Sequence, residues 1–97
     1  MRKINVREIR NTVRGLCISA NVKLRNDIRE ALKKSMKKET KPRAKYILKI
    51  LLENAGMAER EDLAICQDTG LAVIDLALGQ DVRLLGGDLI KAINDGV

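Results

Sequence analysis

The chain has 97 residues, enough for one small domain or for part of a larger one. It contains no histidine, which excludes histidine-based catalysis and histidine-ligated metal within it, and Tyr46 is its only aromatic residue. The formal charge of +6 divides unevenly, because residues 1–50 hold 16 Lys and Arg against 4 Asp and Glu (+12) while residues 51–97 hold 3 against 9 (−6).

The first half of the chain has the periodicity of amphipathic helices. Apolar residues at helical spacing predict three helices, over residues 5–21, 26–38 and 42–57. Asn5 and Glu8 have the spacing of a capping box at the start of the first helix, and Pro42 suits the first turn of the third. Gly56 indicates a stop or a weak point near the end of the third helix.

The pattern changes at residue 63, where helical spacing gives way to short apolar runs. These runs predict β-structure over residues 63–66 and 71–85, with a turn at residues 79–81. Gly86 and Gly87 end the last run, and Asp88 is placed to cap a helix that starts there. Three amphipathic helices, a short β-segment and the start of another helix indicate the α+β fold class.

The two cysteines, Cys17 and Cys66, lie too far apart in sequence to suggest a disulfide framework. Cys17 falls on the apolar stripe of the first helix, which favours a core position over a ligand or redox role. No apolar run approaches the ~20 residues that span a bilayer, and the N-terminus lacks the pattern of a signal peptide. We therefore expect a cytoplasmic protein.

The densest polar cluster is Cys66-Gln67-Asp68-Thr69-Gly70, between two apolar runs. A thiol, an amide and a carboxylate in series can supply a soft metal ligand, a hydrogen-bond donor and a proton carrier. Gly70 permits a positive φ or a close backbone approach. A plainer interpretation stays open, with Cys66 as a buried strand residue and Asp68-Thr69-Gly70 as an Asx-type turn.

Ile65 to Gly70, followed by Leu71-Ala72-Val73, resembles the signature of class I fumarases and of the α subunit of tartrate dehydratase, which are iron–sulfur hydro-lyases. Residues 79–82, 86–89 and 92–97 resemble the segments that follow in that family. The resemblance implies that residues 1–97 are the N-terminal part of a larger α+β catalytic domain, helical over residues 1–58 and with strands and a helix start over residues 59–97.

The resemblance also implies a [4Fe–4S] cluster on three cysteines, with one iron open to act as a Lewis acid on the leaving hydroxyl of a 2-hydroxy dicarboxylic acid such as malate or tartrate. Cys66 matches the first cluster cysteine. Gln67 and Asp68 match residues that reach the substrate, and Asp68 is the candidate proton carrier. The family's other cluster cysteines fall beyond residue 97, so we expect the chain to be inactive alone and to work with the rest of the domain or a β subunit, in a homo- or hetero-oligomer.

Two other functions stay open. The +12 first half could belong to a basic helical module that binds nucleic acid, although the chain lacks aromatic residues for base stacking. Asp68-Thr69-Gly70 could form half of an aspartic protease site, in which two chains bring two carboxylates together. The 67 mostly helical residues before this triplet argue against the protease, because such proteases are nearly all-β.

Overall fold

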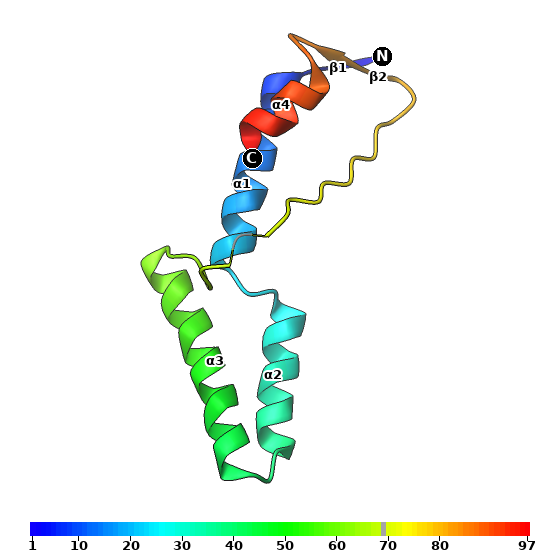
Figure 1. The fold of residues 1–97 in the computed structure, drawn as a ribbon. Helices are drawn as coiled ribbons and strands as arrows, with labels where there is room; N and C mark the ends of the chain where they lie inside the picture. The colour runs from blue at the N-terminus through cyan, green and yellow to red at the C-terminus, as the bar shows by residue number, and fades with distance from the viewer. Residues whose placement is uncertain (69) are drawn as a thin grey trace. The chain divides into compact units, whose positions relative to one another are not determined.

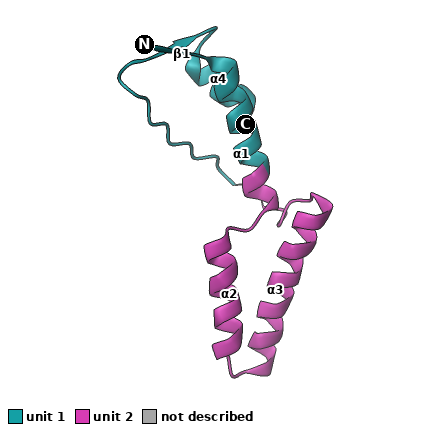
Figure 2. Cartoon of the chain, turned by 180° about the vertical axis from the view of Figure 1, so that it is seen from behind, with its two compact units in different colours: residues 1–18, 69–97 teal, residues 19–68 magenta. Residues whose placement is uncertain are grey.

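The computed structural model describes residues 1–68 and 70–97. In these residues six elements follow one another in the order β1 (Arg2–Asn5), α1 (Val6–Val22), α2 (Asn26–Lys38), α3 (Pro42–Glu61), β2 (Val82–Leu85) and α4 (Leu89–Gly96) (Figure 1). Helices combined with a small sheet confirm the predicted α+β class. The chain divides into two compact units, a first unit of residues 1–18 and 69–97 and a second unit of residues 19–68 (Figure 2).

The sheet of the first unit consists of β1 and β2, paired in parallel with Arg2 opposite Val82 and Asn5 opposite Leu85. Residues 82–85 were predicted to be extended, but β1 was not predicted. Each strand leads within a few residues into a helix, β1 into α1 and β2 into α4. Because the strands are parallel, both helices start from the same edge of the sheet.

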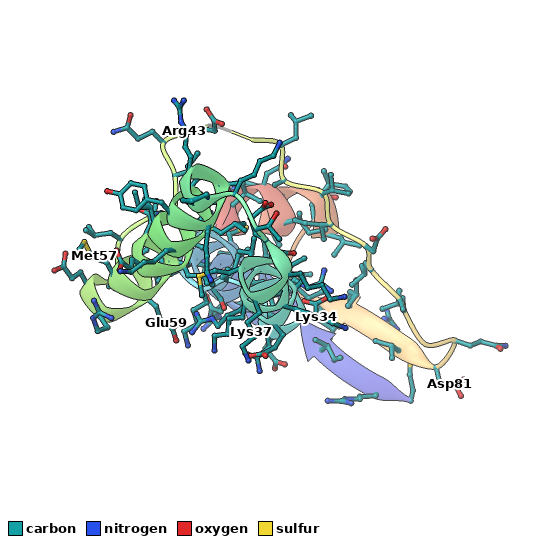
Figure 3. All side chains as sticks on the ribbon, turned by 90° about the horizontal axis from the view of Figure 1, so that it is seen from below. Lys34, Lys37, Arg43, Met57, Glu59 and Asp81 are labelled. Atoms are coloured by element: carbon teal, nitrogen blue, oxygen red, sulfur yellow. The ribbon has the colours of Figure 1, made fainter. Side chains whose placement is uncertain are left out.

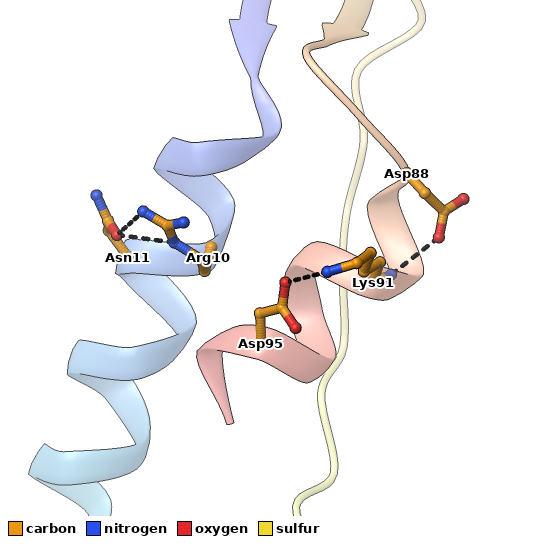
Figure 4. A network of polar contacts seen from close by, with 5 residues as sticks. All are labelled: Arg10, Asn11, Asp88, Lys91 and Asp95. Atoms are coloured by element: carbon orange, nitrogen blue, oxygen red, sulfur yellow. Dashed lines mark hydrogen bonds and ion pairs between the residues drawn. The ribbon is translucent and has the colours of Figure 1, made fainter.

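Side-chain caps fix the starts of both helices. The Asn5 Oδ1 accepts a hydrogen bond of 2.9 Å from the Arg7 N–H. Figure 4 shows the second cap, in which the Asp88 Oδ2 accepts a hydrogen bond of 2.9 Å from the Lys91 N–H. These bonds confirm the predicted positions of the two helix starts. Gly86, which precedes the second cap, has a φ of +90°, and a Cβ there would lie 2.6 Å from the Asn5 Nδ2. Glycine is therefore needed beside the first cap.

Helix α4 packs closely on α1. A Cβ added to Gly96 would lie 2.6 Å from the Arg10 carbonyl oxygen and 2.9 Å from the Val13 Cβ. The buried residues of this unit are small or aliphatic: Val6, Val13, Ala92 and Gly96. On the exposed side of α4, Lys91 and Asp95 form an ion pair of 2.8 Å (Figure 4). Both residues of this pair belong to α4, so the contact between α4 and α1 is made by the close approach at Gly96 and not by the ion pair.

We therefore expect Gly96→Ala to lower the free energy of unfolding by about 1–3 kcal/mol, because the added methyl overfills the α1–α4 contact. Gly15→Ala is the matched control, since a Cβ at Gly15 meets nothing within 4 Å. That control should raise the stability of α1 by roughly 0.5–1 kcal/mol through helix propensity. Urea unfolding followed by circular dichroism measures both. Equal stability of the two variants would show that α4 does not pack on α1 as described.

The second unit is built on a hairpin of α2 and α3, which pack side by side (Figure 1). Pro42 occupies the first turn of α3 as predicted, and Ala55 and Ala58 are buried in that helix. Arg29 of α2 and Glu59 of α3 form an ion pair of 2.9 Å. The lysine face of α2, which includes Lys34 and Lys37, is exposed (Figure 3). Four of its residues are lysines: Lys33, Lys34, Lys37 and Lys38.

The predicted stop at Gly56 is wrong, because α3 continues to Glu61. Glycine in a helix interior costs roughly 1 kcal/mol relative to alanine. The buried neighbours Ala55 and Ala58 show that tertiary packing on α2 outweighs this cost here. The helix ends instead at Asp62, which adopts a left-handed φ of 56°.

The predicted strand over residues 63–66 is also wrong. The Leu63 and Ile65 N–H groups donate to carbonyls of α3 and α1, at Ala58 and Asn21, so they form no sheet ladder. Residues 71–78 were predicted to form a strand, but the structure assigns them no regular secondary structure, and they pair with no strand in the described part of the chain. The strand that β2 does pair with lies at the N-terminus, some 80 residues away in sequence.

Candidate functional site

The loop that carries the polar cluster starts directly at the end of α3. Asp62 takes the left-handed conformation that terminates many helices and that Asp tolerates better than most residues. The Leu63 N–H then donates a hydrogen bond of 2.9 Å to the Ala58 carbonyl, which satisfies one of the last carbonyls of the helix. The direction in which the chain leaves α3 is thus fixed by the backbone.

Ile65 is the anchor of this loop. Its N–H donates a hydrogen bond of 2.8 Å to the carbonyl of Asn21, in the last turn of α1. Its carbonyl accepts a hydrogen bond of 2.8 Å from the side-chain amide of Asn54 in α3. Both contacts lie within the second unit. Two hydrogen bonds from two helices therefore hold the residue immediately before Cys66.

Cys66, Gln67 and Asp68 follow this anchor and are all exposed. The backbone bends at Ile65 and again at Gln67, so the three residues do not continue as a strand. This geometry contradicts the alternative that Cys66 is a buried strand residue. The alternative turn over Asp68-Thr69-Gly70 stays a prediction, because Thr69 lies outside the described residues. The roles of Cys66 as ligand and of Gln67 and Asp68 as substrate contacts stay predictions.

An exposed thiol such as that of Cys66 can reach a metal, and a [4Fe–4S] cluster normally takes three or four such thiolates. Cys17 is half-buried in α1, as expected for its apolar stripe. Nowhere in residues 1–68 and 70–97 do three His, Cys, Asp or Glu side chains gather into a metal site. The described residues therefore fit one corner of a cluster site and do not complete it.

Asn54 was not identified from the sequence as a residue that supports the site. It lies in the middle of α3 beside the apolar stripe, where an amide has a lower helix preference than the Leu and Ala around it. An unexplained Asn inside a helix can signal a side chain that bonds to backbone elsewhere, and here that bond goes to the loop before Cys66.

We expect Asn54→Ala to loosen the Cys66 loop. Loss of one hydrogen bond to the Ile65 carbonyl removes about 1 kcal/mol, which corresponds to a roughly five- to tenfold faster amide exchange over residues 63–68. Asn94→Ala is the matched control, because Asn94 is an exposed helical asparagine outside the loop's contacts. Hydrogen–deuterium exchange reads out both variants. Unchanged exchange in Asn54→Ala would mean that Asn54 does not hold the loop.

The first unit contains a shallow hollow of about 290 Å³ beside the start of α4. Its charged lining residues are Arg7, Arg10, Asp88, Lys91 and Asp95. The Asp88 side chain accepts a hydrogen bond from the Lys91 N–H of its own helix, and the Asp95 carboxylate forms an ion pair with the Lys91 ammonium (Figure 4). The hydrogen bond to Asp95, with the negative charge of that carboxylate, raises the pKa of Lys91 above its usual value. Both carboxylates of the hollow thus bond within α4, whereas the Arg10 guanidinium donates to the Asn11 side chain (Figure 4).

No helix in the described ranges combines the length and the apolar character that crossing a bilayer requires. No solved structure is significantly similar to the chain. Residues 10–97 match the protein family described as fumarate hydratase (Fumerase). Over 88 residues the chain is 31% identical to a protein of Methanocaldococcus jannaschii named "Putative L(+)-tartrate dehydratase subunit alpha".

That alignment covers 91% of this chain and 30% of the relative, so the chain spans less than a third of the length of the protein it matches. Both matches include Cys66 and its neighbours, and neither supports the nucleic-acid-binding or the protease alternative. With the family match running from residue 10 to residue 97, the chain belongs to the fumarate hydratase family.

Proposed function

We propose that this chain is part of a hydro-lyase that reversibly removes water from a 2-hydroxy dicarboxylic acid, with malate or tartrate as the substrate class. Family membership supports a hydro-lyase. The observation that carries the proposal is the exposed bend Cys66-Gln67-Asp68, held at Ile65 by two helices and lying inside the family match. A thiol, an amide and a carboxylate are there presented together on an anchored loop.

In this proposal Cys66 holds one iron of a [4Fe–4S] cluster, and the remaining thiolates come from outside residues 1–97. When bound, such a cluster supplies a Lewis-acidic iron that polarises the leaving hydroxyl of the substrate. The exposure of the Cys66 thiol is compatible with this role, because the thiolate must be accessible to bind metal. A reducing compartment such as the cytoplasm would keep that thiol available.

The side chains after Cys66 have separate tasks in this proposal. The Gln67 carboxamide can donate to one substrate oxygen and accept from another, which orients the hydroxy acid. The Asp68 carboxylate holds a proton in one direction of the reaction and returns it in the other. Both groups are exposed in these 97 residues, so other polypeptide has to cover them before water is excluded from the site.

We further propose that residues 1–97 are the N-terminal part of the catalytic domain and that this domain works with a second subunit. The relative's name includes "subunit alpha", which supports a partner subunit. The short match to that relative supports additional catalytic polypeptide, which would supply the cluster cysteines and the basic residues for the substrate carboxylates.

The test uses the native assembly, meaning this chain together with whatever polypeptide accompanies it in its source cells, isolated without oxygen. Malate, both tartrate enantiomers and fumarate are offered in turn, and formation or loss of the carbon–carbon double bond is followed by ultraviolet absorbance. Turnover of at least one of them supports the proposal. An assembly that turns over none of these acids would refute it.

A further inference from the structure

Residues 71–78 are an extended segment whose backbone groups pair with no other part of residues 1–68 and 70–97. Figure 1 shows the segment as a bare trace between the Cys66 loop and β2. Its side chains are correspondingly open to solvent, with Leu71 94% and Val73 83% exposed. Ile74, Leu76 and Leu78 are also among the exposed large apolar residues of the chain. An eight-residue apolar segment in this state lacks both a hydrogen-bonding partner and a cover.

The residue pattern of this segment is that of a strand buried on both faces. In an extended chain alternate residues point to opposite faces, so one face carries Leu71, Val73, Asp75 and Ala77 and the other carries Ala72, Ile74, Leu76 and Leu78. Seven of the eight residues are apolar, and neither face is polar. A strand with one face in water instead alternates apolar residues with polar ones, as β2 does where the exposed Arg83 stands between Val82 and Leu84.

Asp75 is the one charged residue of the segment, and the structure records no hydrogen bond or ion pair for its carboxylate in the described residues. A buried carboxylate without a partner is strongly unfavourable. Whatever covers this strand must therefore bring a cation or hydrogen-bond donors to Asp75. A second copy of the segment cannot do so, because residues 71–78 contain no Lys or Arg and would bring a second carboxylate.

We propose that residues 71–78 form a central strand of a β-sheet whose neighbouring strands belong to the part of the family's polypeptide outside these 97 residues, and that one neighbour places a Lys or Arg beside Asp75. The aligned region is 30% of the relative's length, so most of that protein lies outside the match and can supply such strands. The inference rests on the family membership and not on the proposed reaction.

Pairing of this strand would also complete the support of the Cys66 loop. The loop is anchored at Ile65 on one side, and residues 71–78 begin shortly after it on the other. Once the strand is locked in a sheet, both ends of the short segment between them are fixed.

The test is hydrogen–deuterium exchange over residues 71–78, in the 97-residue chain alone and in the native assembly. The isolated chain should exchange at nearly unprotected rates at every concentration. The assembly should slow exchange by on the order of 10³-fold or more, as for central strands of stable domains. Rapid exchange in the assembly would overturn the proposal, and protection of the isolated chain that grows with concentration would assign the strand to a second copy instead.

The charge partner is tested with Asp75→Lys in the native assembly. The matched control is Asp81→Lys, which makes the same charge change at an exposed turn residue (Figure 3). Asp75→Lys should speed exchange of residues 71–78 at least tenfold more than the control, because it sets two cations against each other inside the sheet. Equal effects of the two substitutions would contradict a cation beside Asp75.

Discussion

Cys66→Ala in the native assembly is expected to remove the iron–sulfur cluster and the dehydratase activity together. In the proposed site, loss of the Cys66 thiolate would leave the cluster with fewer protein ligands than the three or four that [4Fe–4S] clusters normally take. Iron and acid-labile sulfide per chain, measured beside turnover, give the result directly. Because Cys66 is exposed, the loss of its thiol should leave the packing of the fold unchanged.

The control for this substitution is Cys17→Ala, which removes a thiol from the half-buried face of α1. That variant should keep both cluster and turnover and show only a modest loss of stability. A Cys66→Ala assembly that still holds its cluster would remove Cys66 from the site. A Cys17→Ala assembly without a cluster would show that the two cysteines had been assigned to the wrong roles.

Asp68→Asn is expected to retain the cluster and to lower kcat by on the order of 10²–10⁴, the usual span for a general acid or base. The amide keeps the shape of the carboxylate and part of its hydrogen bonding but cannot carry the proton. Turnover is measured at saturating substrate, so that a change in KM does not conceal the change in kcat.

Asp62→Asn is the matched control, because it makes the same change from carboxylate to amide in the same loop. Asp62 ends α3 in a left-handed conformation that Asn also tolerates. This control should have near-normal turnover. If Asp68→Asn also turns over normally, Asp68 merely shapes the turn, and the proton carrier is a residue outside this chain.

The helical half of the fold could be predicted from the sequence because its determinants are local. The apolar stripe over residues 26–38 predicts a helix with the bounds that α2 has in the structure, and Pro42 marks the start of α3. The end of α3 could not be predicted, since Gly56 is a local signal against a helix and packing on α2 overrides it. Local propensity is a weak guide where tertiary contacts act.

The β-structure was harder to predict because its hydrogen bonds are not local. Arg2–Asn5 pairs with Val82–Leu85 across most of the chain, and a four-residue segment with one apolar side chain gives no period-2 signal of its own. Residues 71–78 carry a clear signal for a buried strand, yet they have no neighbour within the described residues. The composition of residues 71–78 predicts a buried strand, but it does not indicate which segment would pair with that strand.

The candidate site was predicted in part. Its residues, Cys66, Gln67 and Asp68, were identified from a sequence motif, and the structure adds how they are presented. The anchor could not be predicted, because the bond from Asn54 to the Ile65 carbonyl joins two segments whose approach depends on where α3 ends. The exposure of the three side chains likewise depends on the bend at Gln67, which the residue types alone left undecided.

In the proposed enzyme, this chain contributes Cys66 to the metal site of a hydro-lyase. The most direct measurement is the dehydratase activity of the native assembly before iron removal, after chelation, and after anaerobic return of iron, sulfide and thiol, with the Cys66 thiol titrated by an alkylating reagent at each stage. We expect activity to be lost and restored with the iron, and Cys66 to be alkylated only in the iron-free stage. Activity that survives complete iron removal, or a Cys66 thiol that reacts equally at all three stages, would contradict it.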